Sequence, residues 1–173
     1  MTFLLRLFSR LRNWLVRRDP ASLDSDGQPT PPPYELDGSQ VVARFIYSQN
    51  KMSASRPRPA VFDPSPHNEL SVVHSTGLTD DEAWKIGSRT LGTEPGRKTI
   101  RGRADVPVHV LIEQKLRAMR DDNPFERHTS VLDWPSSNDP NEAKQLRKLI
   151  CLELSQHPEV TLAIPKATTG ILN

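Results

Sequence analysis

Four short stretches of the chain have apolar residues at alternate positions or a high content of β-branched residues. They are residues 41–48, 70–75, 128–134 and 159–165. A period of two and enrichment in Val, Ile, Thr and aromatic residues are typical of β-strands. The very basic residues 98–103 predict a fifth, shorter strand.

Apolar residues three and four positions apart predict helices between these strands. Thr79 and Glu82 form a capping-box pattern, which places the start of a short helix near residue 80 and its end near residue 87. A second helix is predicted over about residues 106–120, with Asp105 as its N-cap.

A third helix is predicted over about residues 140–156, because Asp139 can cap it and Pro140 suits its first position. We expect its core-facing side chains to be Leu146, Leu149, Ile150 and Leu154. The order of elements then predicts an α+β domain over residues 41–165, with a small mixed sheet of about four to five strands and three packed helices.

The first eighteen residues, MTFLLRLFSRLRNWLVRR, predict a separate amphipathic helix. A 100° rotation per residue gathers Arg6, Arg10 and Arg17 on one face. The opposite face carries Leu4, Phe8, Leu11, Trp14 and Leu15. Arginine interrupts every apolar run, which disfavours an export signal and a spanning helix. We therefore expect a protein that is not secreted.

Residues 19–40 are rich in Pro, Ser, Asp and Gly and predict a flexible linker, and residues 166–173 predict a loose tail. A helix on such a tether suits an anionic lipid surface or the groove of a partner protein. A transit peptide and an ordinary core helix are the other two interpretations. The linker counts against the core helix, because it lets the first helix stay away from the domain.

Composition and charge narrow the picture further. The formal net charge is +2, but residues 1–18 contain five arginines and no acidic residue. Residues 19–173 therefore contain 18 basic and 21 acidic residues. A general affinity for nucleic acid does not follow from this balance, although nucleic acid stays open as a ligand. The single cysteine, Cys151, excludes an intramolecular disulfide framework and fits the predicted third helix as a small buried residue.

Candidate chemistry in the domain rests on arginines and histidines. The chain has neither a glycine-rich phosphate loop nor zinc-ligand spacing, so we expect no cofactor and no metal. The residues that can bind a phosphate or another anion are Arg44, Lys98, Arg101 and Arg103. Arg44 lies inside an apolar strand and needs an anion partner or exposure, and an ion pair with an acid of the domain is the expected solution.

His74 and His128 are the candidate catalytic residues, since each lies in a predicted strand beside hydroxyl side chains. In both positions, packing with one ring nitrogen bonded is the alternative. Two functions are consistent with these residues. The favoured one is a cytoplasmic binding or accessory domain, held at the inner face of a membrane or on a larger assembly. The alternative is a small enzyme or nucleotide-binding domain that acts on a phosphate-containing ligand.

Overall fold

The computed structural model describes residues 32–90 and 99–165. By its contacts the chain divides into two units, Met1–Pro32 and Pro33–Asn173, and the described elements belong to the second unit. The helix predicted for residues 1–18, most of the linker, Lys98 and the tail at residues 166–173 lie outside the described residues.

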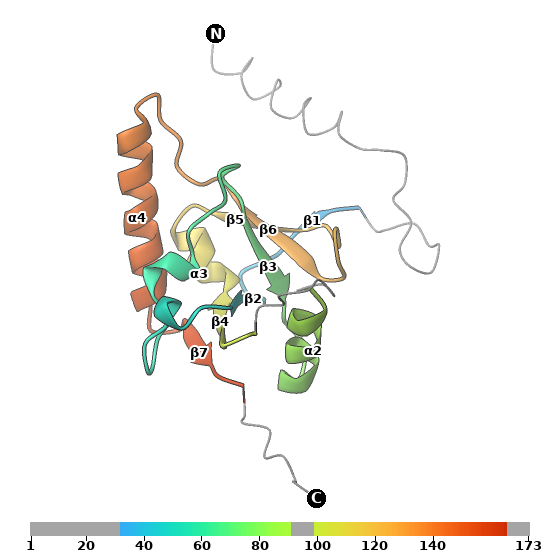
Figure 1. The fold of residues 1–173 in the computed structure, drawn as a ribbon. Coiled ribbons are helices and arrows are strands. Elements are labelled where there is room, and N and C mark those ends of the chain that lie inside the picture. The colour runs from blue at the N-terminus through green and yellow to red at the C-terminus, as the bar shows by residue number, and fades with distance from the viewer. Residues whose placement is uncertain (1–31, 91–98, 166–173) are drawn as a thin grey trace, which may run out of the picture. The chain divides into compact units, whose positions relative to one another are not determined.

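The described residues form a single antiparallel sheet of seven strands (Figure 1). In order across the sheet, the strands are β1 (Tyr34–Glu35), β5 (Arg117–Arg120), β6 (His128–Leu132), β3 (Leu70–His74), β2 (Val41–Ile46), β4 (Gly102–Pro107) and β7 (Thr161–Ala163). Every pair of neighbours is antiparallel. The α+β class is therefore confirmed, whereas the sheet has more strands than predicted and is not mixed.

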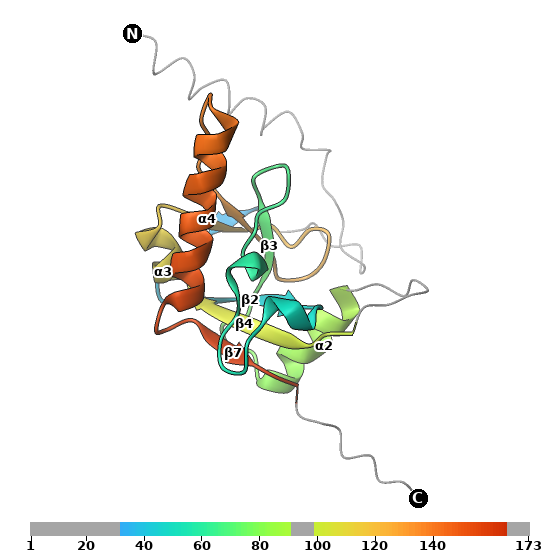
Figure 2. The same ribbon diagram turned by 60° about the vertical axis from the view of Figure 1, so that its left-hand side comes forward.

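The three α-helices of the described residues pack on this sheet (Figure 1 and Figure 2). They are α2 (Asp80–Thr90), α3 (Val108–Glu113) and α4 (Pro140–Gln156), and two short 3-10 helices, η1 (Gln49–Lys51) and η2 (Pro59–Val61), follow β2. Trp84 of α2 contacts Phe45 of β2, with ring centroids 6.1 Å apart. Leu154 of α4 packs instead in the main core with Val42 and Ile46 of β2. Because side chains alternate along a strand, α2 and α4 cover opposite faces of the sheet.

Local sequence signals at the helix starts are confirmed by the contacts made there. The Thr79 amide donates to Oε2 of Glu82 at 2.8 Å, which is half of the predicted capping box. The Asp139 carboxylate accepts from the Asn141 amide at 2.8 Å, as an N-cap does. These bonds satisfy amide groups that have no partner inside a helix.

The buried side of α4 is rotated from the predicted one. Leu146 and Leu149 are 43% and 55% exposed, whereas Leu154 is fully buried. The buried positions of the helix are Ala143, Cys151, Leu154 and Ser155. The helix thus packs through Leu154 and three smaller side chains, so the expectation for Leu146 and Leu149 was wrong.

The predicted helix over residues 106–120 was also wrong. Residues 102–107 pair with the whole of β2, from Ile46 opposite Gly102 to Val41 opposite Pro107. Asp105, the predicted N-cap, is a strand residue opposite Ala43. The helix keeps only Val108–Glu113, and residues 117–120 form β5 against β6. Long-range strand pairing overrode a helical apolar pattern there.

The folded unit begins earlier than residue 41. Tyr34 and Glu35 pair with β5 at the sheet edge, and Leu36 is 2% exposed in the core. A short apolar anchor after the prolines therefore secures the end of the predicted linker. No helix among the described residues is long and apolar enough to cross a bilayer.

Candidate functional site

Strands β3 and β6 place Ser71 and His128 on the same face of the sheet. Ser71 is opposite Ser130, and Val73 is opposite His128. Opposite residues share a face, and so do residues two apart on one strand, which makes Ser71 and His128 diagonal neighbours. The Ser71 hydroxyl oxygen lies 2.8 Å from Nε2 of the His128 ring.

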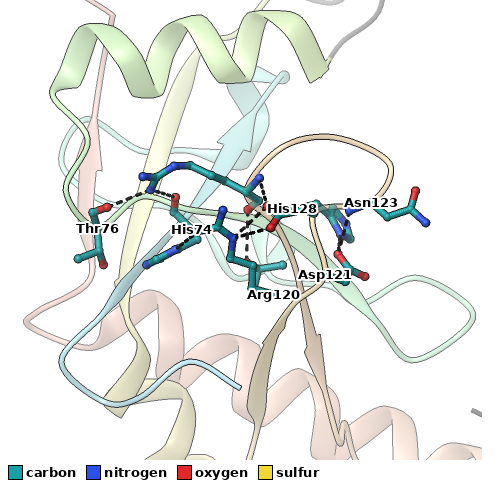
Figure 3. Close-up of polar contacts among 9 residues, drawn as sticks. His74, Thr76, Arg120, Asp121, Asn123 and His128 are labelled. Atoms are coloured by element: carbon teal, nitrogen blue, oxygen red, sulfur yellow. Dashed lines mark hydrogen bonds and ion pairs between the residues drawn. The ribbon is translucent and has the colours of Figure 1, made fainter. Parts of the chain in front are cut away.

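Asp121, the residue after β5, completes a chain of three side chains. Its Oδ1 lies 2.6 Å from Nδ1 of His128 (Figure 3). The side chain of His128 is 6% exposed and that of Asp121 is 31% exposed. A serine, a histidine and a carboxylate are thereby joined through the two nitrogens of one buried imidazole.

The loop between β5 and β6 closes on His128 and fixes the aspartate. The amides of Asp121 and Asp122 both donate to the His128 carbonyl, at 3.2 and 3.4 Å, and the His128 amide donates to the Phe125 carbonyl at 3.1 Å. The Asn123 amide donates to the Asp121 carboxylate at 3.3 Å. The Asp121 carboxylate is therefore oriented by backbone as well as by the imidazole.

Phe125 of the same loop covers the imidazole. Its ring meets the His128 ring edge to face, with centroids 4.9 Å apart and planes at 89°. Phe125 also lines a cavity of about 130 Å³ together with Ser71. Ser71 thus lines a cavity, beside a histidine whose side chain is shielded from water.

This cavity occurs where β2 and β3 separate. The two strands pair at only two positions, Val42 with His74 and Ala43 with Val73. Beyond these positions β2 continues against β4, and β3 continues against β6. Residues of both strands then line the cavity, namely Ala43, Arg44, Phe45 and Tyr47 on one side and Ser71, Val72 and Val73 on the other.

Arg44 crosses this opening. Its Nη1 donates to the Ser71 carbonyl at 2.6 Å, and its Nε donates to the Val61 carbonyl at 3.4 Å. Within residues 32–90 and 99–165, no carboxylate forms an ion pair with Arg44, so the expected ion pair is absent there. Burial lowers the pKa of this guanidinium below its usual value, because it removes water that would stabilise the charge.

A second cavity, of about 370 Å³, meets the first at Arg44 and Ser71. Its other walls come from the loop before β3, and they include Asp63, His67 and Glu69. Glu69 accepts a hydrogen bond from Ser130. Ser71 therefore borders two cavities, a small one without a carboxylate in its lining and a larger one lined in part by Asp63 and Glu69.

His74 lies on the opposite face of the sheet from His128, in register with Val42. Its Nδ1 is 3.0 Å from Nη1 of Arg120 (Figure 3), and its Nε2 is buried with no hydrogen-bond partner among the described residues. Burial, followed by the charges of Arg120 and Arg127, lowers the pKa of His74. The two candidate histidines therefore do not form one site.

Arg103 is held in a separate ionic cluster. It donates to Asp105 at 2.8 Å and to Asp80 at 2.9 Å, and its guanidinium lies 5.1 Å from the centroid of the Trp84 ring. Arg101 is exposed, and its amide donates to the Ile46 carbonyl. Of the predicted anion-binding residues that the structure describes, Arg44 is the one that contacts Ser71.

Cys151 is buried in α4, as expected. Burial and the neighbouring Asp63 raise the pKa of its thiol to about 12, so the thiolate is scarce at neutral pH. Ser71, hydrogen-bonded to an imidazole, is the better candidate nucleophile.

Ser71 and Asp121 were missed by the sequence interpretation. Ser71 is one of many serines, and Asp121 followed a predicted helix whose last residues proved to be strand β5. The available signal was the turn sequence DDNPFE between two possible strands, which would have placed Asp121 beside His128 in a hairpin.

The comparisons with known proteins add no function. The chain matches no protein-family model, and no curated protein and no solved structure shows significant similarity to it. The geometry of the described residues is therefore the basis for assigning a function.

Proposed function

We propose that this domain is a small acyl-transfer hydrolase in which Ser71 is the nucleophile, His128 the general base and Asp121 the residue that orients the base. The observation that carries the proposal is the continuous hydrogen-bonded chain from Ser71 through His128 to Asp121. The same combination of side chains serves hydrolysis on several unrelated folds, where geometry rather than sequence position identifies it.

The hydrogen-bond partners determine which nitrogen of His128 carries the proton. An ionised carboxylate only accepts hydrogen bonds, so the neutral ring must donate from Nδ1 to Asp121. Nε2 is then free to accept from the Ser71 hydroxyl. This is the tautomer that a general base toward Ser71 requires.

The proposed reaction has two stages. Ser71 Oγ attacks the carbonyl carbon of an ester or amide while its proton passes to Nε2 of His128. The bond to the leaving group breaks, and the leaving group takes that proton, which leaves an acyl-serine. Water then attacks the acyl carbon and gives a proton to Nε2, which returns it to Ser71 Oγ as the acid departs.

The amide of Ser71 is placed to stabilise the oxyanion. In an antiparallel strand the N–H and C=O of one residue point to the same side. The Ser71 carbonyl accepts from Arg44 of β2, and the Ser75 amide donates to the Val41 carbonyl, so alternate residues of this strand point toward β2. Since the pairing ends at Ala43 and Val73, we expect the Ser71 amide to point into the opening between the strands.

Labelling with a fluorophosphonate tests the proposal directly. We expect the wild-type protein to gain one covalent adduct, detected by intact mass, and peptide mapping to place it on Ser71. Ser71→Ala should abolish the adduct. Ser130→Ala is the matched control, because Ser130 lies on the same face but bonds to Glu69, and it should label like the wild type. Absence of labelling in the folded wild type, or equal labelling of Ser71→Ala, would overturn the proposal.

We also propose that residues 1–18 attach the domain to an anionic lipid surface, because their sequence pattern separates arginines from Leu, Phe and Trp. This role is compatible with either catalysis or partner binding by the domain. Deletion of residues 2–18 should release the protein from vesicles containing phosphatidylserine in a flotation assay. Equal flotation of both proteins would contradict the lipid role and leave a partner protein as the target.

A further inference from the structure

The position of Arg44 indicates which substrates the proposed hydrolase takes. Three other arginines of the domain are each paired with carboxylates: Arg103 with Asp105 and Asp80, Arg117 with Asp133 and Glu35, and Arg120 with Asp122. Arg44 has only the carbonyls of Val61 and Ser71 among the described residues. A half-buried guanidinium with no counter-ion among the described residues is destabilising, and an anion bound beside it would offset that cost.

The guanidinium of Arg44 has N–H donors that make no hydrogen bond with the described residues. A guanidinium carries five N–H groups, and the bonds to Val61 and Ser71 use one on Nε and one on Nη1. Nη2 and the second hydrogen of Nη1 have no hydrogen bond with the described residues. Two such neighbouring donors match the two oxygens of a carboxylate.

Arg44 lines both cavities at Ser71, but the cavities differ in charge. The larger one contains Asp63 and Glu69, whose carboxylates would repel an anion. The smaller one, between β2 and β3, has no carboxylate in its lining, and its polar residues are Arg44, Tyr47 and Ser71. Its volume of about 130 Å³ is well below the roughly 300 Å³ at which pockets begin to take drug-sized ligands. An anionic group is therefore favoured on the acyl side, on a short chain.

Building on the proposed hydrolase, we propose that its substrates are esters or amides of short acyl groups that end in a carboxylate. The acyl chain lies in the cavity between β2 and β3, and its carboxylate binds Arg44 while Ser71 attacks the carbonyl. The leaving group lies toward the larger, acidic cavity.

A matched pair of esters tests this specificity. The p-nitrophenyl esters of valerate and of glutarate have five-carbon acyl chains that differ only in a terminal methyl or carboxylate. For the wild type, kcat/KM for the glutarate ester should exceed that for the valerate ester by about tenfold or more, the effect of one charge-assisted hydrogen bond. Equal values for the two esters, or a preference for valerate, would overturn the inference.

Variants at Arg44 test its contribution separately. Arg44→Met should lower the glutarate-to-valerate ratio of kcat/KM by about tenfold, mainly through KM, and Arg44→Lys should restore part of it. Arg89→Met, at an exposed position of α2, is the control and should keep the wild-type ratio. If the ratio is unchanged in a folded Arg44→Met protein, as judged by circular dichroism, Arg44 does not bind the acyl carboxylate.

Calorimetry with Ser71→Ala separates this inference from the proposed function. That variant cannot form an acyl-serine but keeps Arg44, so it should bind glutarate and bind valerate at least about tenfold more weakly. Binding of glutarate by a protein whose wild type turns over neither ester would support the anion site and reject the hydrolase. If the wild type turns over both esters equally and Ser71→Ala does not bind glutarate, the hydrolase is supported and the anion site at Arg44 is rejected.

Discussion

The two histidines that the sequence singles out lie one strand apart, yet the two faces of the sheet give them opposite surroundings. His128 is hydrogen-bonded through its two ring nitrogens to the side chains of Ser71 and Asp121, and Ser71 lines a cavity. His74 accepts from Arg120 on the face that carries the main core, and its other nitrogen is buried without a partner among the described residues. Strand parity, rather than residue type or neighbouring hydroxyls, therefore determines what each ring can do.

Replacement of His128 should separate the two rings most clearly. In His128→Gln the base toward Ser71 is lost, so kcat for a p-nitrophenyl ester should fall by about 10⁴-fold or more. In His74→Gln the chain from Ser71 to Asp121 is intact, and kcat per folded molecule should change by less than about threefold. The measurement is steady-state kinetics with the folded fraction determined by circular dichroism. Equal losses in both variants would show that the two histidines do not differ in role.

The next effect comes from the residue that sets the tautomer of His128. Asp121→Asn replaces a pure acceptor with an amide that can donate, which favours the ring with its proton on Nε2. The proton is then on the nitrogen that must accept it from Ser71, and kcat should fall by about 10³- to 10⁴-fold with little change in KM. Asp122→Asn is the neighbouring control, since Asp122 bonds Arg120 instead. A loss confined to KM would contradict the orienting role.

Sequence signals that act over a few residues predicted the fold correctly, and signals that depend on distant residues did not. Local signals were reliable: the Thr79 and Glu82 cap and the Asp139 cap mark the starts of α2 and α4. Signals that depend on distant pairing failed, because the apolar residues after Asp105 fit a helix until β2 is available to pair with residues 102–107. Because strand β5 was not predicted, Asp121 could not be placed next to His128 from the sequence.

The candidate site divides in the same way. Arg44 stood out as a charge inside an apolar strand and His128 as a strand histidine beside hydroxyl side chains, and the structure brings Ser71 into contact with each of them. Arg103 also stood out, but two carboxylates near it in space already pair with it. Whether a charged residue finds a counter-ion within the domain depends on tertiary contacts, and the sequence does not contain that information locally.

The smallest effect concerns the stability contributed by His74. Its pKa is lowered in the folded protein, firstly by burial and then by Arg120 and Arg127, while Asp122 and Asp37 act in the opposite direction. At a pH below the unfolded-state value of about 6.5, the unfolded chain binds a proton that the folded protein does not. The free energy of unfolding should therefore decrease as pH falls from about 7.5 to about 5.5, and it should decrease less in His74→Gln. Urea denaturation at the two pH values measures this, with His109→Gln, at a more exposed ring, as the control. If His74→Gln loses as much stability as the wild type over this range, His74 is not held neutral by its surroundings, and the contrast between the two faces is weaker than the contacts indicate.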